Sequence, residues 1–291
     1  MSENLTHTAV TDDCVRLALH SPSICEPFKL ALRDHLEIAR LGGVTRWGDR
    51  HSTDLLARYR EAWPPGHDDA LAPKLAFVLG WLCHRAADRQ MKPVFRRTDP
   101  DCPCKPTDCS VYHDVFVFHE VYRSGSEEPY SPRMLAAPPA PELEEEFRIL
   151  MQRALLGMHT FVPEEGKPAS GDVDVWLGRL LELRQRFYVD TARYAEAAAN
   201  PDPDKVRRFL DEPNFYDPDD AIIRVARSIQ RGRADEGIGL DDALREAGAA
   251  SQYAQAVGKA YGYIRAASEF FMGRLDRETL QEDLDIGKPG G

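Results

Sequence analysis

Residues 69–89 read DALAPKLAFVLGWLCHRAADR, and this run has the apolar spacing of an α-helix. Apolar residues recur every three or four positions, which places them on one face. The residues expected on the buried face are Leu75, Phe77, Val78, Trp81, Leu82 and Ala86. Pro93 is expected to end this helix or to follow just after its end, since proline removes a helical N–H donor. The run predicts a buried helix.

Most other segments share this helical periodicity, and few alternate like strands. Residues 115–118 are good β-formers, but the length of the surrounding segment suits a buried helix better. We expect Thr11 to cap the first helix and Gly42-Gly43 to stop the second. The expected helices span 11–20, 26–41, 52–63, 69–89, 108–122, 142–159, 173–199, 204–211, 221–230, 240–247 and 251–275. The sequence therefore predicts an all-α, multi-helix bundle.

A proline-rich segment divides the chain into two parts. Residues 124–141 contain five prolines and are expected to form a linker or long loop. A loop of this length is unusual inside one compact domain, so it is the best candidate boundary. We expect a helical metal-site region over 1–123 and a second helical region over 142–291, which could pack into the same domain.

Composition limits the classes of partner. The net charge of −11 disfavours nucleic acid, because binding it needs a basic surface. The longest apolar stretch, near 75–83, is too short to span a bilayer, and the first residues do not resemble a secretory signal. A Walker loop and a Gly-x-Gly-x-x-Gly motif are both absent. We expect a cytoplasmic protein without a stable membrane anchor, and a homo-oligomer stays open.

Histidine and cysteine are confined to one part of the chain. All nine histidines and all six cysteines lie within the first 159 residues. Clustered cysteines in a reducing compartment are more often metal ligands or buried thiols than disulfides. Any chemistry that depends on these side chains is therefore expected in the first half.

His84 and Asp88 are the sharpest candidate pair. They are four residues apart, so a helix places them on one face. The neighbouring turns are apolar, and a buried imidazole or carboxylate needs a polar partner. A metal cation would serve both, and this pair suits zinc, iron or manganese. The alternative is a His–Asp hydrogen bond that packs one helix against another.

A second set of candidate ligands lies in DCSVYHDVFVFHE, residues 108–120. On a helix, Cys109, His113 and Glu120 fall near one line. His113 and Glu120 could then face the first pair and complete a shell between packed helices, as bundles often do. The alternative is that Glu120 is solvated and that His113 merely packs.

A competing use of the same histidine is a small structural zinc site. Cys102, Cys104 and Cys109 precede His113 at spacings that allow them to act as ligands with it. The two sites exclude each other unless they are merged, because both need His113.

One motif in this region resembles a known family. The pattern Phe-x-Leu-Gly-Trp-x-x-His84-x-x-x-Asp88 is similar to the metal-binding His-x-x-x-Asp helix of zinc-dependent phospholipase C, which is related in fold to the S1/P1 nucleases. The likeness covers residues 28–123. Within it, His51 precedes a helix as a family histidine does. Asp34 ends an apolar segment, like the family's metal-bridging aspartate.

The chain departs from the family pattern in two places. Lys92-Pro93 stands where the family usually has a further histidine. The later His-x-x-x-Glu is replaced by His113 with Glu120, or by the adjacent His119-Glu120. One or two metals are therefore expected rather than a cluster of three.

The resemblance implies metal-dependent hydrolysis of a small-molecule or lipid phosphoester. The expected cofactor is zinc or another divalent transition metal, which lowers the pKa of its bound water to about 7. Asp34 is the candidate base or bridging ligand, and Arg46, Arg50 or Arg85 would neutralise phosphate charge. The implied metal ligands are His51, His84, Asp88, His113 and Glu120.

Two other functions are consistent with the same residues. A metallophosphohydrolase of the HD type needs an adjacent His-Asp pair, which His113-Asp114 or His67-Asp68 would supply. A non-enzymatic helical scaffold or regulatory protein would use His84 and Asp88 as a structural pair.

Overall fold

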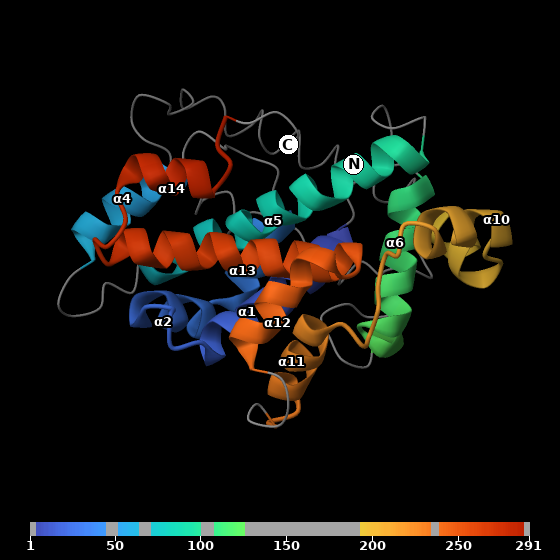
Figure 1. Ribbon diagram of the computed structural model, residues 1–291, viewed down its shortest axis with the longest axis horizontal. Coiled ribbons are helices and arrows are strands. Elements are labelled where there is room, and N and C mark those ends of the chain that lie inside the picture. Colours follow the sequence, from blue (N-terminus) through green and yellow to red (C-terminus); the bar gives the residue numbers. More distant parts are fainter. Residues whose placement is uncertain are drawn as a thin grey trace, which may run out of the picture.

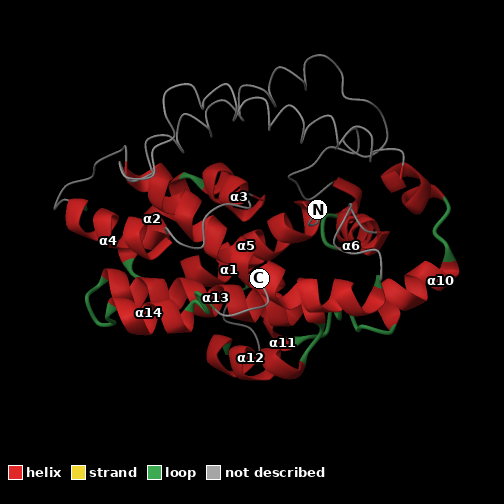
Figure 2. Cartoon of the chain, turned by 90° about the horizontal axis from the view of Figure 1, so that it is seen from above, coloured by secondary structure: helices red, strands yellow, loops and turns green. Residues whose placement is uncertain are grey.

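The computed structural model describes residues 4–44, 52–63, 71–99, 108–125, 193–233 and 239–287. Within these ranges the chain forms helices joined by turns and short loops, with no strand. Figure 2 shows the helices packed on one another without a sheet. The predicted all-α, multi-helix bundle is confirmed.

The helices of the two halves share one core. In the first half they are α1 (Asn4–His20), α2 (Glu26–Asp34), α3 (Leu36–Val44), α4 (Ser52–Ala62), α5 (Leu71–Thr98) and α6 (Asp108–Glu120). In the second half they are α10 (Pro203–Val206), α11 (Ala221–Gln230), α12 (Leu240–Glu246), α13 (Gln252–Phe271) and α14 (Arg277–Asp283). Residues 193–199 are also helical, and a π-helical turn spans Arg207–Asp211. The long helices α5 and α13 pack against each other through buried side chains of both halves.

The bundle is elongated, and its ends are built from different helices. Figure 1 shows α13 running along the middle of the molecule and crossing in front of α5 and α1. Helices α4 and α14 lie at one end, and α6 and α10 lie at the other (Figures 1 and 2). Helices α11 and α12 lie together on one side, where α11 packs against α1. Helix α1 is therefore enclosed by elements from both halves.

Helix α1 is buried along most of its length. Every residue from Leu5 to Val15 is buried, polar and apolar alike. Its neighbours are α2, α3, α5, α6, α11 and α13. The prediction that this helix starts at Thr11 is wrong, because it begins at Asn4 and the Thr11 hydroxyl donates to the carbonyl oxygen of His7 within it.

Glycines bring α3 unusually close to α5. A Cβ added to Gly80 of α5 would overlap the carbonyl oxygen of Ala39, and one added to Gly42 of α3 would overlap the carbonyl oxygen of Phe77. The prediction that Gly42-Gly43 stops a helix over 26–41 is therefore wrong. The chain breaks instead at His35, and these glycines lie inside α3, where they allow the close approach.

Two further differences from the predictions concern α5 and α14. Helix α5 continues through Pro93 to Thr98, so the proline lies inside it. Helix α14 was not predicted; its N-cap is Asp276, whose side chain accepts from the backbone N–H of Thr279. The expected linker beyond residue 125 and the helices expected over 142–159 and 173–192 lie outside the described residues.

In the ranges given above, no helix combines the length and apolar character needed to cross a membrane.

Replacing Gly80 with alanine is expected to lower the free energy of unfolding by about 1–3 kcal/mol, because the new methyl group overlaps the backbone of α3. The matched control is Gly262→Ala in α13, where an added Cβ meets no atom within 4 Å. That change should stabilise the helix by about 0.5–1 kcal/mol. Urea unfolding of both variants measures the difference. Equal stability of the two would contradict the close packing of α3 on α5.

Candidate metal centre

The candidate centre begins with His84 and Asp88 on α5. Their four-residue spacing places both on one face, as predicted from the sequence, and both are buried. The Oδ2 atom of Asp88 lies 3.3 Å from the Nε2 atom of His84. The next turn of the same face carries Lys92, whose Nζ lies 3.0 Å from Asp88 Oδ2.

The third member of the centre is His7 from α1. Its Nε2 atom lies 3.3 Å from Asp88 Oδ1, so the two histidines approach opposite oxygens of one carboxylate. The imidazole rings of His7 and His84 are stacked, with centroids 4.5 Å apart and planes inclined by 29°. One potential ligand atom from each of these three residues lies within 4.8 Å of the other two. In the described part of the chain, no other trio of His, Cys, Asp or Glu converges in this way.

A backbone carbonyl orients the ring of His84. Its Nδ1 atom lies 3.0 Å from the carbonyl oxygen of Gly43, which can only accept, so Nδ1 carries the proton and donates. In the neutral ring, Nε2 then presents a lone pair toward Asp88. This is the usual support for a metal-binding histidine, whose outer nitrogen donates to a carbonyl or carboxylate.

The charge state of the centre also suits a cation. Burial lowers the pKa of His84, and the nearby His7 lowers it further, so the neutral ligand form is favoured. Burial alone would raise the pKa of Asp88, but its contacts with the two imidazoles outweigh burial and hold that pKa well below its usual range. The carboxylate is therefore ionised, and a cation that replaced the proton on the neighbouring imidazole would meet a charged oxygen ligand.

The separations can be compared with those of a small coordination shell. Zinc binds imidazole nitrogen and carboxylate oxygen at about 2.0–2.2 Å, which makes the edge of a tetrahedral shell roughly 3.3 Å. Each imidazole lies 3.3 Å from one carboxylate oxygen, but the two distances end on different oxygens, so one ligand atom from each residue lies within the looser limit of 4.8 Å. Among the described residues, His84 Nε2 and Asp88 Oδ1 are buried and have no hydrogen-bond partner of good geometry. Two histidines and one carboxylate therefore form a group that could hold a metal ion.

The first turn of α1, which carries His7, is held by α6. The Asp114 carboxyl accepts hydrogen bonds from the backbone N–H of Thr6 at 2.9 Å and from its hydroxyl at 3.0 Å. The Tyr194 hydroxyl donates to the other oxygen of Asp114 at 3.1 Å. An N-terminal amide of α1 is thus satisfied by a side chain from another helix. This capping fixes the position of the adjacent His7.

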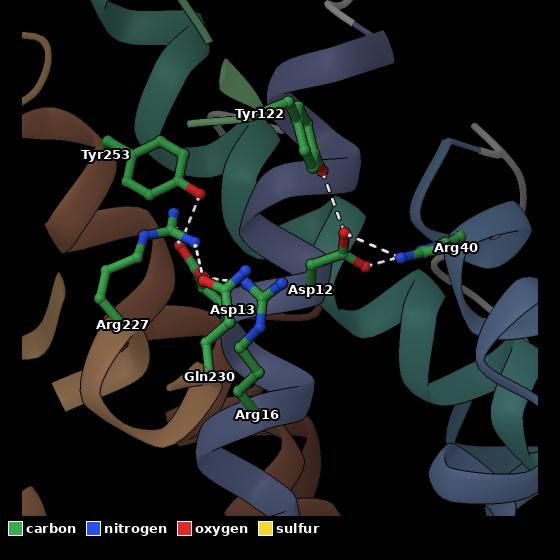
Figure 3. Close-up of polar contacts among 8 residues, drawn as sticks. All are labelled: Asp12, Asp13, Arg16, Arg40, Tyr122, Arg227, Gln230 and Tyr253. Atoms are coloured by element: carbon green, nitrogen blue, oxygen red, sulfur yellow. Dashed lines mark hydrogen bonds and ion pairs between the residues drawn. The ribbon is translucent and has the colours of Figure 1, made fainter. Parts of the chain in front are cut away.

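Further along α1, Asp12 ties the helix to α3. The Arg40 guanidinium donates to both carboxylate oxygens, at 2.8 and 3.2 Å, and the Tyr122 hydroxyl donates at 3.1 Å (Figure 3). Burial raises the pKa of Asp12, while the charge of Arg40 opposes that rise. A bidentate pair of this kind fixes geometry as well as charge.

The adjacent Asp13 ties α1 to the second half of the chain. Figure 3 shows three donors gathered around its carboxylate. Arg16 of the same helix donates at 2.6 Å, Arg227 of α11 at 3.0 Å and the Tyr253 hydroxyl of α13 at 2.8 Å. The register of α1, and with it the height of His7 opposite α5, is therefore set by elements on several sides.

The structure places three of the sequence-predicted site residues away from this centre. His113 is fully buried, stacks on Phe215 with ring centroids 3.8 Å apart, and its Nε2 lies 2.9 Å from the carbonyl oxygen of Phe209. Glu120 and Asp34 are exposed at the ends of α6 and α2. None of the three joins His84 and Asp88 in the described centre.

The remaining predicted ligands and phosphate-binding arginines either lie elsewhere in the fold or are not described. Cys109 is buried with its sulfur 3.6 Å from His113 Nε2. Arg85, a candidate for phosphate charge, instead donates to the backbone carbonyls of Leu284 and Asp285. Outside the described residues lie His51, Arg46, Arg50, Cys102 and Cys104, together with the alternative pair His67-Asp68.

Sequence reasoning missed His7, because the first helix was expected to begin at Thr11. The available signal was the spacing of buried residues in the N-terminal segment. Cys14, Val10 and Thr6 recur every four positions and extend the helical pattern back past His7. A helix that is buried on all sides has little contrast between its faces, which hides such a signal.

Removing the cap on α1 should destabilise the fold. Asp114→Ala is expected to lower the free energy of unfolding by about 2–4 kcal/mol, because the buried donors of Thr6 and Tyr194 lose their acceptor. Asp114→Asn is the matched control, since it keeps one acceptor oxygen and should cost less. Denaturant unfolding monitored by circular dichroism gives both values. An alanine variant as stable as wild type would show that α1 does not depend on this cap.

No family model matches this chain, and neither a curated protein nor a solved structure matches it.

Proposed function

We propose that His7, His84 and Asp88 bind one divalent transition-metal ion, such as zinc, and that a metal-bound water hydrolyses a phosphoester. The observation that carries the proposal is the approach of three buried residues from α1 and α5, each with a ligand atom within 4.8 Å of the other two. Two histidines and a carboxylate leave coordination positions for water and substrate, as in catalytic zinc sites.

Each of the three residues has a distinct role in holding the ion. His7 and Asp88 supply a nitrogen and a charged oxygen, and His84 supplies a nitrogen whose direction is set by the Gly43 carbonyl. A divalent ion held by these residues would supply Lewis-acid chemistry, which would activate water near neutral pH. Rigid placement of the ligands on packed helices keeps this geometry without a reorganisation cost.

The choice of a phosphoester rests on the resemblance of the segment from Phe77 to Asp88 to zinc-dependent phospholipase C. The ligand set differs from the one that the resemblance implies, because the histidine that meets Asp88 comes from α1 rather than α6. Proposed substrates are small-molecule or lipid phosphoesters.

A structural role is the second candidate, and a specific observation favours it. The Lys92 ammonium lies 3.0 Å from Asp88 Oδ2, so the carboxylate already has a cationic partner from its own helix. In that case, the cluster would join α1 to α5 in a scaffold protein without metal chemistry.

Metal analysis separates the two candidates. Wild-type protein incubated with zinc and then desalted should retain about one equivalent, and His7→Ala, His84→Ala and Asp88→Ala should each lose it. His119→Ala is the matched control, because His119 is exposed and makes a hydrogen bond to Ser124. Zinc at a concentration of 100 times the Kd should stabilise the wild type by about 2.7 kcal/mol. A wild-type protein that takes up no metal and melts normally supports the scaffold.

Hydrolysis is tested separately from binding. The zinc-loaded protein should release p-nitrophenol from p-nitrophenyl phosphate or its diester, and a chelator or Asp88→Ala should abolish the release. His119→Ala should keep the wild-type rate. If the protein binds zinc through these three residues but hydrolyses neither ester, the metal site stands and the hydrolase proposal is wrong.

A further inference from the structure

We propose that Lys92 is the substrate-recognising residue of this centre and that it selects a dianionic phosphate, the form of a phosphate monoester. This inference rests on the proposed metal site and assigns its substrate class. Lys92 follows Asp88 by one turn of α5, and its ammonium lies 3.0 Å from the carboxylate. It is therefore a charged group beside the ligands that is not itself a ligand.

The exposure of the side chains increases from the imidazoles toward Lys92. The exposed fraction rises along the centre from 1% for His7 and 4% for His84 to 10% for Asp88 and 31% for Lys92. The ligand atoms His84 Nε2 and Asp88 Oδ1 are themselves buried, and Lys92 is the most exposed of these four side chains.

The net charge of the proposed centre indicates the charge of a ligand that would match it. A divalent ion held by two neutral imidazoles and the single carboxylate of Asp88 keeps one positive charge, and Lys92 adds another. Two positive charges at a partly buried site match a dianion better than a monoanion, because Coulomb attraction is stronger where water is excluded. The whole protein carries −11, so a local positive site is needed to attract such a substrate.

The side chain has the reach and freedom for this role. A lysine ammonium on a flexible stem can exchange one oxygen partner for another. A bound cation would partly neutralise the Asp88 carboxylate and weaken its attraction for the Lys92 ammonium. The ammonium could then exchange Asp88 Oδ2 for a phosphate oxygen. Lysine is a common point-charge ligand for phosphate.

Calorimetric titration of zinc-loaded protein with inorganic phosphate at pH 8 tests this role. Lys92→Met should weaken phosphate binding at least tenfold with unchanged zinc content, and Lys92→Arg should restore part of it. Lys74→Met removes the same charge from the same helix about 27 Å away and should bind like wild type. Dimethyl phosphate, a monoanion, should bind more weakly than phosphate to the wild type.

The outcomes separate the two proposals. Zinc uptake with phosphate affinity unchanged in Lys92→Met, or with dimethyl phosphate bound as tightly as phosphate, overturns the role of Lys92 and leaves the metal site standing. A wild-type protein without zinc overturns both. Vesicles containing phosphatidic acid identify the source of the phosphate. Lys92-dependent vesicle binding assigns a lipid headgroup, whereas Lys92-dependent binding of inorganic phosphate alone assigns a soluble ester.

Discussion

Helix α1 is buried along most of its length, and the surrounding helices must satisfy its polar side chains. A helix enclosed on all sides would normally be apolar, yet the buried stretch from Leu5 to Val15 includes Asp12 and Asp13. A buried polar group without a partner costs about 1–3 kcal/mol, and a charged one costs more. Surrounding helices must therefore present arginine and tyrosine side chains at fixed heights, and these contacts set the register of α1.

The close contact of α3 with α5 also orients a side chain of the candidate centre. Gly42 and Gly80 remove the side chains that would hold these helices apart. The same approach brings the Gly43 carbonyl within 3.0 Å of His84 Nδ1, which decides the tautomer of that ring. A contact made for packing thus directs the lone pair of a candidate ligand, and it places His84 in line with His7 on the neighbouring α1.

The members of the centre differ in burial. The stacked imidazoles are the most buried members, and Lys92 on the other side of Asp88 is the most exposed one. Burial lowers the pKa of His84, and contacts with the two imidazoles hold the pKa of Asp88 low, so a cation would meet a charged carboxylate beside an imidazole that releases its proton readily. Three of these four residues share one face of α5, so only His7 depends on the placement of a second helix.

The all-α class follows from helical periodicity along most of the chain, and the pairing of His84 with Asp88 follows from their spacing on one helix. Their contact with His7 rather than His113 comes from the packing of the helices, since a different packing could bring either histidine to that face. His113 stacks on Phe215 instead, in a contact between the two halves of the chain. Local periodicity shows which residues share a face of a helix. Which other helix packs on that face depends on the pairing of buried charges and on the close contacts between helices.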